Sequence, residues 1–345
     1  MATKGSQYIT FRDINSGRLP DGMLDKDVVE LIAKENPALD DVVWKECSKG
    51  REDITTIRTG IPEAVFRAYY EGVQGSKGSK RQVANTCGTI STAVEFDARL
   101  YDDSKDKTAF LMDEVEQHAE AIGQGAATAL FYGDVKSNPK GFNGFAKTYC
   151  ATAKAASDTD EAAYYVLNGS RASNGSTAML RSLFMIGWGK KSAHGIYPEG
   201  TSMGLQRGKL EFTYVADPDD SSKKLRIGIQ ELNMNVGLNI RDFRYCGRIA
   251  NIEADAAISV TSGMPDYVEL LTRLSCRVKQ EGVNARLYMC RAVWEAYCAA
   301  FYRKTAGNAV KFADLGQRLP ASLMGIGVGI CDALNVNETT VAQAS

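Results

Sequence analysis

One stretch of the chain, residues 53–132, limits the possible folds more than any other. Apolar and polar residues alternate over 54–57 and again over 90–100, a period of two that predicts strands with one covered face. The segment between them, 72–81, carries too little apolar surface to pack against its own chain. A two-stranded ribbon of this kind is only marginally stable alone. We therefore expect something outside the subunit to cover it, which favours assembly over catalysis.

A long amphipathic helix is predicted directly after the ribbon, between Asp106 as N-cap and Gly133 as the residue that ends it. Its length of about 40 Å could cross a whole domain. Gly123 and Gly125 each cost about 1 kcal/mol relative to alanine. Close approach of another backbone would offset this cost, and local flexibility is the alternative. One apolar stripe recurs every three to four residues, at Leu111, Val115, Ala119, Ile122, Ala126 and Leu130.

The rest of the chain is predicted to alternate between the two kinds of secondary structure, after a polar arm at 1–25. Helices are expected where apolar residues recur at helical spacing, over 26–36, 160–167, 176–186, 265–280 and 284–303. Strands are expected over 209–215, 224–230, 238–249 and 323–331, and a loop over 187–204. The first two of these strands flank a polar turn at 217–222, so they should form a hairpin.

Composition narrows the class of protein. The chain has 345 residues, 44% hydrophobic and 24% charged, which is typical of a globular protein with one elaborated core or two. Its net charge is −1, whereas a dedicated nucleic-acid binder normally carries a basic excess. Binding of DNA or RNA by the whole surface is therefore not expected, although weak contact from one face is still allowed.

The eight cysteines form no CxxC pair, so a structural zinc site is not expected. They are interpreted as buried free thiols in a reducing compartment. Residues 1–6 lack an apolar signal core, and no apolar run approaches the roughly 20 residues of a membrane span. The prediction is a protein made in a cytosol, with no membrane contact.

Candidate catalytic and metal-binding residues are few. His118 and His194 are the only histidines and neither lies in a catalytic motif, so surface or loop packing is the preferred interpretation. Asp217, Asp219 and Asp220 could bind Ca²⁺, but the 12-residue loop pattern is absent and a solvated turn is favoured. No catalytic residue, metal ligand or cofactor is therefore predicted, and the chain is not expected to be an enzyme.

Two glycine-rich segments and one basic cluster remain. Residues 72–78 lack Walker spacing and a following helix, and 325–329 is an apolar strand with no βαβ unit before it. Lys77, Lys80 and Arg81 could neutralise phosphates or an acidic neighbour. They could equally keep an exposed ribbon soluble and block wrong edge pairing. For the three residues, a subunit contact at the ribbon tip ranks above contact with nucleic acid.

Several short strings stand out along the chain: Leu-Phe-Tyr-Gly-Asp at 130–134, Asn-Pro-Lys-Gly-Phe at 138–142, the stretches 237–252 and 287–291, and 325–338 with its Asp-Ala-Leu. Together with the order of elements, these strings resemble the major capsid proteins of tailed bacteriophages, and within them a podophage-type branch. The resemblance runs from about residue 40 onward. One departure is Gly-Val-Gly-Ile at 327–330, where that family often has a proline.

The resemblance implies an α+β, HK97-like phage capsid fold. The expected parts are an N-terminal arm with a short helix (1–50), an extended loop formed by a β-hairpin (51–104), a spine helix with a peripheral domain (105–150), an axial domain (151–320) with a β-hairpin insertion near 205–250, and a closing peripheral strand and tail (321–345). The extended loop would lie over a neighbouring subunit, and the arm would cross beneath another.

The resemblance also implies a function. The chain would be the major capsid protein that self-assembles into pentamers and hexamers of an icosahedral phage head around double-stranded DNA. Its place would be the virion, after synthesis in the host bacterial cytoplasm. Expected partners are further copies, a separate scaffolding protein, a portal, a possible decoration protein and, weakly, the packaged DNA. The alternatives are the shell of an encapsulin-like nanocompartment and, in a different class, a cytosolic carbohydrate- or metal-binding hydrolase-like domain.

Overall fold

The computed structural model describes residues 36–58, 60, 62–152, 162–170, 179–216, 222–253, 266–306, 322–323 and 325–342. Its helices are α2 Ala38–Asp41, α3 Ala98–Asp103, α4 Lys107–Tyr132, α5 Phe145–Thr148, α7 Tyr267–Arg277 and α8 Arg291–Ala306, with 3₁₀ turns η1 Ala162–Tyr165, η2 Phe243–Tyr245 and η4 Asp332–Leu334. Its strands are β1 Trp44–Glu46, β2 Glu52–Arg58, β3 Lys80–Thr86, β4 Gly88–Asp97, β5 Val166–Asn168, β6 Leu180–Trp188, β7 Ala193–Tyr197, β8 Leu205–Arg207, β9 Glu211–Ala216, β10 Lys224–Ile240, β11 Cys246–Glu253, β12 Asn284–Met289, β13 Ser322–Leu323 and β14 Ile326–Ile330.

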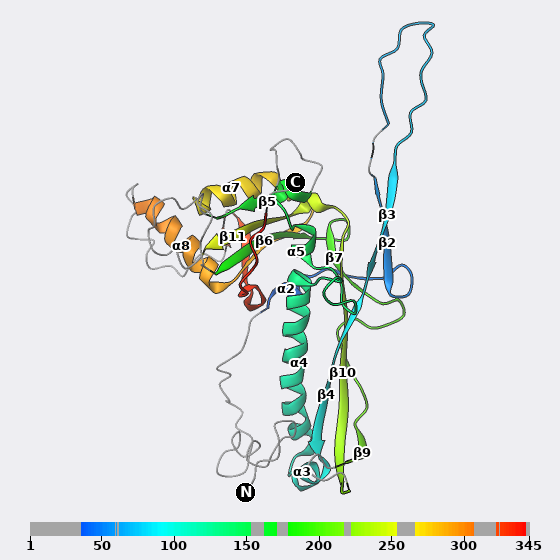
Figure 1. Ribbon diagram of the computed structural model, residues 1–345, viewed down its shortest axis with the longest axis vertical. Coiled ribbons are helices and arrows are strands. Elements are labelled where there is room, and N and C mark those ends of the chain that lie inside the picture. The colour runs from blue at the N-terminus through cyan, green and yellow to red at the C-terminus, as the bar shows by residue number, and fades with distance from the viewer. Residues whose placement is uncertain are drawn as a thin grey trace.

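Helix α4 is the longest helix in the described part of the chain, and it runs alongside β4 and β10 (Figure 1). It begins where predicted: the Asp106 carboxylate accepts hydrogen bonds from the backbone N–H groups of Thr108 and Ala109 at 3.0 and 3.1 Å. It also ends where predicted, with the Gly133 N–H bonded to the Ala129 carbonyl. The helix and both of its boundaries are confirmed.

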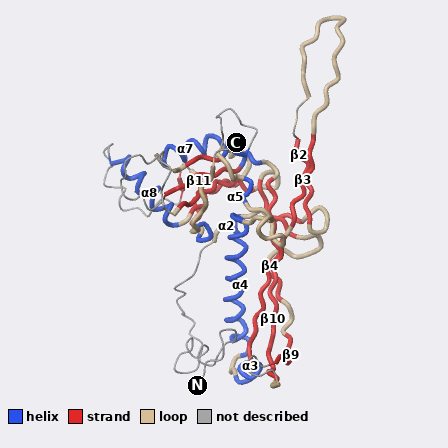
Figure 2. The backbone as a smooth tube through the Cα atoms, in the orientation of Figure 1, coloured by secondary structure: helices blue, strands red, loops and turns tan. Residues whose placement is uncertain are grey.

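Strand β10 connects the two halves of the molecule. Its 17 residues exceed the usual strand length of roughly 3–10. The first part pairs antiparallel with β9, β4 and β8, and the last part, from Gly237 to Ile240, pairs antiparallel with β7. One continuous strand therefore belongs both to the narrow sheet beside α4 and to the broad sheet above it (Figure 2).

The broad sheet forms the main core. Its central strand β6 is buried at all nine positions, between β11 on one side and β12 on the other. Phe131, in the last turn of α4, packs against Phe184 of β6 and Tyr288 of β12, with ring centroids 5.4 and 6.0 Å apart. The end of the long helix is thereby fixed in this core.

A buried polar cluster joins the C-terminal segment to the same place. The guanidinium of Arg248 on β11 lies 2.5 Å from the Glu338 carboxylate and donates to Ser182 at 2.9 Å. Ser182 also donates to Glu338 at 2.6 Å, and the hydroxyl of Tyr132 donates to the other carboxylate oxygen. A buried ion pair is tolerated only when its remaining donors and acceptors are satisfied, as they are here. The cluster therefore fixes helix, sheet and tail to one another.

Several predicted helices are wrong. Residues 180–186 of the predicted helix 176–186 form strand β6, and 284–289 form strand β12 before α8 begins. Strand β6 is buried at every position, and periodicity cannot separate such a strand from a buried helix. In β12 only the last three residues, Leu287 to Met289, are buried, and they run directly into α8. The helix predicted over 160–167 is a single 3₁₀ turn followed by β5.

Other boundaries also differ from the prediction. The strand over 90–100 ends at Asp97, whose carboxylate caps α3 by accepting from the Arg99 N–H at 2.9 Å. The strand over 238–249 is interrupted by η2, and the loop over 187–204 contains β7. Helix α7 and the pairing of β9 with β10 are confirmed. The turn residues Asp217, Asp219 and Asp220 lie outside the described residues, as do residues 26–35 of the helix predicted over 26–36.

The close approach expected at the helix glycines is not found within the described chain. A Cβ built on Gly123 meets no atom within 4 Å, and one on Gly125 meets only a methyl group of Ile90, at 3.9 Å.

Replacing Asp106 by alanine should lower the free energy of unfolding by about 1 kcal/mol, because two N–H groups in the first turn of α4 lose their acceptor. Chemical denaturation of the purified subunit measures the change. Asp103→Ala is the matched control, since this exposed carboxylate is the last residue of α3, caps no helix N-terminus and should change stability by less than about 0.5 kcal/mol. Equal losses in both variants would contradict the capping role.

Candidate functional site: the projecting ribbon

The ribbon consists of β2 and β3, which pair antiparallel from Glu52↔Thr86 to Arg58↔Lys80 and form a separate two-stranded sheet. The partner of 54–57 is thus 80–86 and not 90–100, because the latter strand pairs with β10. Beyond the paired strands, the chain continues as an extended apex over 62–79. The ribbon and apex project away from the rest of the molecule, in the direction opposite to the free end of α4 (Figure 2).

The apex holds its shape through a few local hydrogen bonds. The Ser76 hydroxyl donates to the Glu63 carbonyl at 2.9 Å, and the Ala68 N–H donates to the Glu71 carboxylate at 3.0 Å. Tyr70 turns the chain with a φ of 67°, a left-handed conformation that is uncommon for a tyrosine. The chain therefore turns at an aromatic residue.

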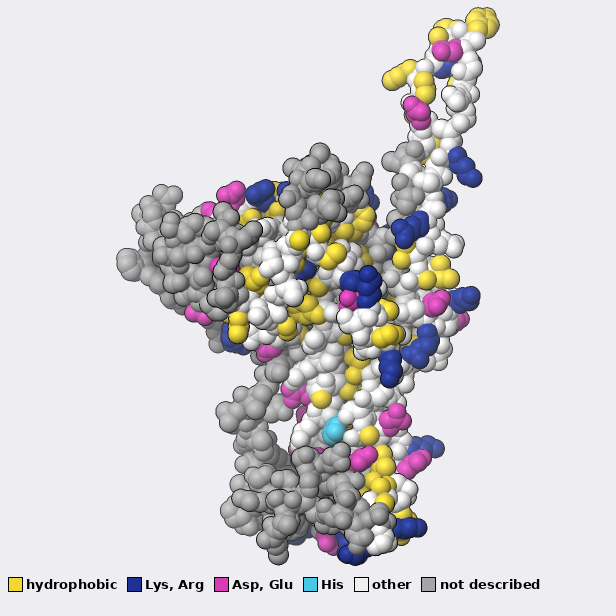
Figure 3. Space-filling view, in the orientation of Figure 1, with side chains coloured by type: hydrophobic (Ala, Val, Ile, Leu, Met, Phe, Trp, Pro, Cys, Tyr) yellow, Lys and Arg dark blue, Asp and Glu magenta, His cyan; other side chains and the backbone are white. Residues whose placement is uncertain are grey.

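Large apolar side chains stand exposed on this apex. The relative exposures of Phe66, Tyr69 and Tyr70 are 103%, 97% and 105%, and Val65 and Val73 are more than 60% exposed. Figure 3 shows hydrophobic side chains at the outermost part of the projection. Contiguous exposed apolar groups commonly mark a surface that binds another protein. Sequence reasoning missed these aromatic residues because it placed the tip at 72–81, although Val-Phe-Arg-Ala-Tyr-Tyr at 65–70 carried the signal.

The three basic residues predicted at the tip are exposed. Lys77 belongs to the apex, whereas Lys80 and Arg81 open β3. They therefore lie along one edge of the projection, below the aromatic side chains. None of them forms a salt bridge within the described residues.

The root of the ribbon is held by one buried amide. Asn239 of β10 is fully buried, and its Nδ2 donates to the Asp53 carboxylate at 2.5 Å and to the Thr55 hydroxyl at 2.8 Å. Its Oδ1 accepts from the Asn85 side chain at 2.9 Å. The amide thus uses both donors and its acceptor on the two strands of the ribbon. It fixes the ribbon to the strand that connects both halves of the molecule.

Charged groups surround this root. Lys45 and His194 each lie 3.5 Å from a carboxylate oxygen of Asp53. Burial opposes the charge of Asp53, but the hydrogen bond from Asn239 and the ammonium of Lys45 hold its pKa below the usual value. Burial lowers the pKa of His194, and the positive charges of Lys45 and Arg241 add to this, so the imidazole is neutral at pH 7. At neutral pH, the ion pair between Lys45 and Asp53 and the neutral imidazole of His194 therefore stabilise the attachment of the ribbon to the body.

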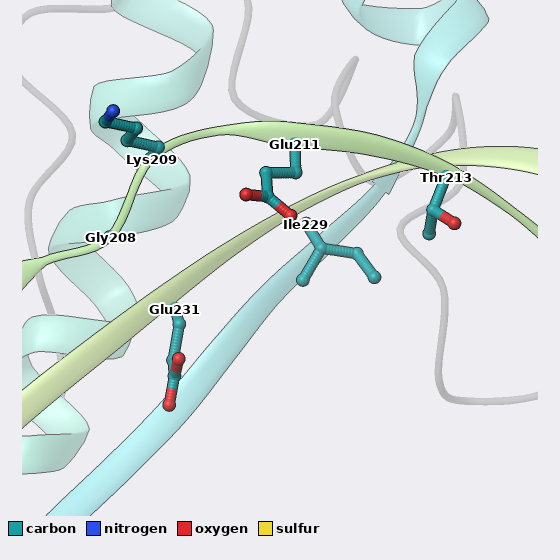
Figure 4. Close-up of a pocket in the computed structure, with 6 residues that line it drawn as sticks. All are labelled: Gly208, Lys209, Glu211, Thr213, Ile229 and Glu231. Atoms are coloured by element: carbon teal, nitrogen blue, oxygen red, sulfur yellow. The ribbon is translucent and has the colours of Figure 1, made fainter.

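The remaining candidates offer no converging chemistry. His118 hydrogen-bonds Thr92 at 2.9 Å and has no catalytic group in that contact. A cavity of about 250 Å³ lies on the narrow sheet, and its lining residues are spread along β9, β10 and the connection before β9 without meeting at one point (Figure 4). Among the described residues, no group of three or more potential ligands could hold a metal ion. The glycine-rich residues 325–329 form β14 and the turn before it.

No helix in the described part of the chain is long and apolar enough to cross a membrane.

The fold is shared with a solved phage shell. The chain is similar to that of bacteriophage Epsilon15 with a TM-score of 0.76 and 23% identity, over 100% of both chains. It also resembles the bacteriophage JBD30 capsid (TM-score 0.44, 11% identity, 90% of this chain and 94% of that chain) and the SrpI encapsulin of Synechococcus elongatus (TM-score 0.38, 8% identity, 63% and 87%). The likeness to the Epsilon15 chain shows that the fold class is the HK97-like phage capsid fold, as predicted.

The family follows from the sequence itself. The model of the family "Major capsid protein GP7" matches residues 20–342, so the chain belongs to this family. No curated protein matches the chain. As a member, the protein is the major capsid protein of a phage head and is located in the shell of the virion. The family is structural, and the prediction of a capsid subunit is confirmed.

Replacing Asn239 by alanine should loosen the ribbon selectively, because Asp53, Thr55 and Asn85 all lose a buried hydrogen bond. We expect a loss of about 3 kcal/mol in the free energy of unfolding. Hydrogen exchange should also become faster over residues 52–86 than over α4. Asn235→Ala is the matched control on the same strand, since this amide accepts from the exposed Thr89 and should cost under about 1 kcal/mol. Uniform exchange across the chain in the Asn239 variant would contradict the anchoring role.

Acid should loosen the same root. Both pKa values are lower in the folded protein than in the unfolded chain, so the stability they supply is present at neutral pH and is lost as the pH falls. For His194 the loss begins near pH 6.5, and for Asp53 near pH 4. Between pH 7 and pH 5, the melting temperature of the wild type should fall more than that of His194→Gln, whose side chain cannot titrate. Parallel pH curves for the two proteins would show that His194 does not contribute.

Proposed function

We propose that the ribbon is the segment by which one subunit binds the next subunit in the shell, with the aromatic apex as its contact surface. The observation that carries this proposal is the nearly complete exposure of Phe66, Tyr69 and Tyr70 on a segment that projects away from its own body. No described element of the same chain lies close enough to cover them (Figure 1). In a shell built from many copies, the surface available for that purpose is a neighbouring subunit.

The free energy expected from the apex contact is suited to the assembly of a shell. Burying one large apolar side chain stabilises an interface by about 1.5–3 kcal/mol. Three such side chains would give a contact that is modest for one pair of subunits. Repetition around a closed shell makes the total large, because each subunit then gives one ribbon and receives another.

The basic edge of the ribbon supplies orientation. Lys77, Lys80 and Arg81 would face an acidic surface on the neighbour, and Asp113 and Glu116 on the exposed face of α4 provide one. Opposite charges across an interface favour one register and speed association more than they add affinity. We therefore assign these three residues to the subunit contact.

The whole assembly is proposed on the same basis. Subunits would form pentamers and hexamers of an icosahedral head, with the axial domain (151–320) at capsomer centres and the N-terminal arm (1–50) beneath a neighbour. The net charge of −1 suits a wall that encloses double-stranded DNA and touches it weakly. A separate scaffolding protein, a portal and a decoration protein complete the proposed partners, and synthesis takes place in the host bacterial cytoplasm.

Replacing Phe66, Tyr69 and Tyr70 together by serine should leave a folded subunit that no longer forms stable shells, because the apex contact loses most of its apolar area. Negative-stain imaging counts particles, and circular dichroism checks that the fold is unchanged. The control carries serine at Met179 and Met203, which are 52% and 55% exposed on the body. Normal yields of stable shells from the apex variant would overturn the proposal.

A separate experiment tests the basic edge of the ribbon. Glutamate at Lys77, Lys80 and Arg81 should slow assembly, and the defect should shrink as salt screens the repulsion. The same exchange at Lys136 and Lys140, which are exposed after α4, is the control. An assembly rate that is unchanged at low salt would remove the three residues from the contact.

A further inference from the structure

Two cysteines lie in contact at the base of the ribbon. The sulfur atoms of Cys47 and Cys87 are 3.2 Å apart, although the residues are 40 positions apart in the sequence. Their relative exposures are 4% and 8%, and together with Ile196 they form a small apolar cluster. In the structure both are free thiols. We infer that Cys47 and Cys87 form a disulfide bond that closes the base of the ribbon once the subunit leaves a reducing compartment.

The backbone positions of the pair are fixed on both sides. The Cys47 N–H donates to the Tyr197 carbonyl at 2.9 Å, and the Cys87 N–H donates to the Arg51 carbonyl at 3.0 Å. Gly237 of β10 packs so closely against Cys87 that an added Cβ would lie 3.1 Å from its Cα. The sulfurs must approach by about 1.2 Å to reach the bond length near 2.05 Å.

The covalent bond would enclose the whole ribbon. Everything from Ser48 to Thr86, including both strands and the apex, lies between the two cysteines in the sequence. Cys47 follows β1, which pairs with β7, and Cys87 precedes β4, which pairs with β10. The bond therefore joins the two places where the ribbon leaves the body, without touching the apex.

The reaction balances with a peroxide as oxidant. A thiolate attacks one peroxide oxygen, so that an S–O bond forms, the O–O bond breaks and hydroxide leaves. The second sulfur then attacks the first, the S–S bond forms, the S–O bond breaks and water leaves. Two thiols lose two electrons and two protons, and hydrogen peroxide becomes two molecules of water. Either thiol can react first, since both residues are similarly buried.

Burial of the two thiols also slows the reaction. It raises the pKa of both thiols, so few thiolates exist at neutral pH. The pair therefore stays reduced during synthesis and oxidises slowly afterwards. The rate should rise about tenfold for each pH unit, because the thiolate fraction does.

The test treats the full-length reduced subunit and assembled shells with hydrogen peroxide, followed by non-reducing peptide mapping. We expect a linked peptide that contains Cys47 and Cys87, and a rise in melting temperature on the order of 5 °C that reductant reverses. Cys47→Ser should abolish both. Cys150→Ser, at an exposed cysteine, is the matched control and should leave both unchanged. If a serine variant does not fold, the oxidised and reduced wild type are compared directly.

Oxidation of the exposed Cys150 and Cys276 without a Cys47–Cys87 link, even at alkaline pH, would overturn the inference. The link is read out in the unassembled subunit, so its formation does not depend on the proposed role of the ribbon. Greater heat resistance of oxidised shells is the separate consequence that does rest on that role.

Discussion

The buried amide of Asn239 is the interaction on which the direction of the ribbon depends. A two-stranded ribbon has little cohesion of its own, because each strand has one partner and no covered face. Here its root is bonded to a strand that is itself paired along most of its length. Asn239 lies at the end of β10 that also pairs with β7, so the ribbon takes its orientation from the rigid centre of the molecule.

That centre is rigid because the long elements end in one core. Helix α4 and strand β10 run side by side, and both enter the broad sheet at the same end (Figure 1). Phe131 packs against the sheet, while the next residue, Tyr132, donates to Glu338 of the C-terminal segment. A force on the ribbon therefore passes through Asn239 into β10 and on to a core in which helix, sheet and tail are joined. A shell subunit needs such continuity, since its neighbours pull on it from several sides.

The sequence predicts those parts of the fold that have a clear hydrophobic periodicity. Helix α4 was predicted with both of its ends, because its apolar stripe and the capping Asp106 are local signals. Strand β6 was predicted as a helix, because burial on both faces removes the alternation that marks a strand. The partner of β2 was not local information, and 80–86 lack a clear alternating pattern. The aromatic apex was readable as Val-Phe-Arg-Ala-Tyr-Tyr, but its exposure follows only from how far the ribbon projects.

The ribbon uses different interactions at its two ends, polar hydrogen bonds at the root and apolar contact at the apex. At the root, buried polar bonds are directional, so they fix an angle and lose strength quickly when geometry changes. At the apex, apolar contact is non-directional and tolerates small shifts of the surface it covers. A closed shell places chemically identical subunits in positions that are not fully equivalent. A ribbon with a fixed base and an adaptable apex meets that requirement, because the subunit keeps its shape while the contact adjusts.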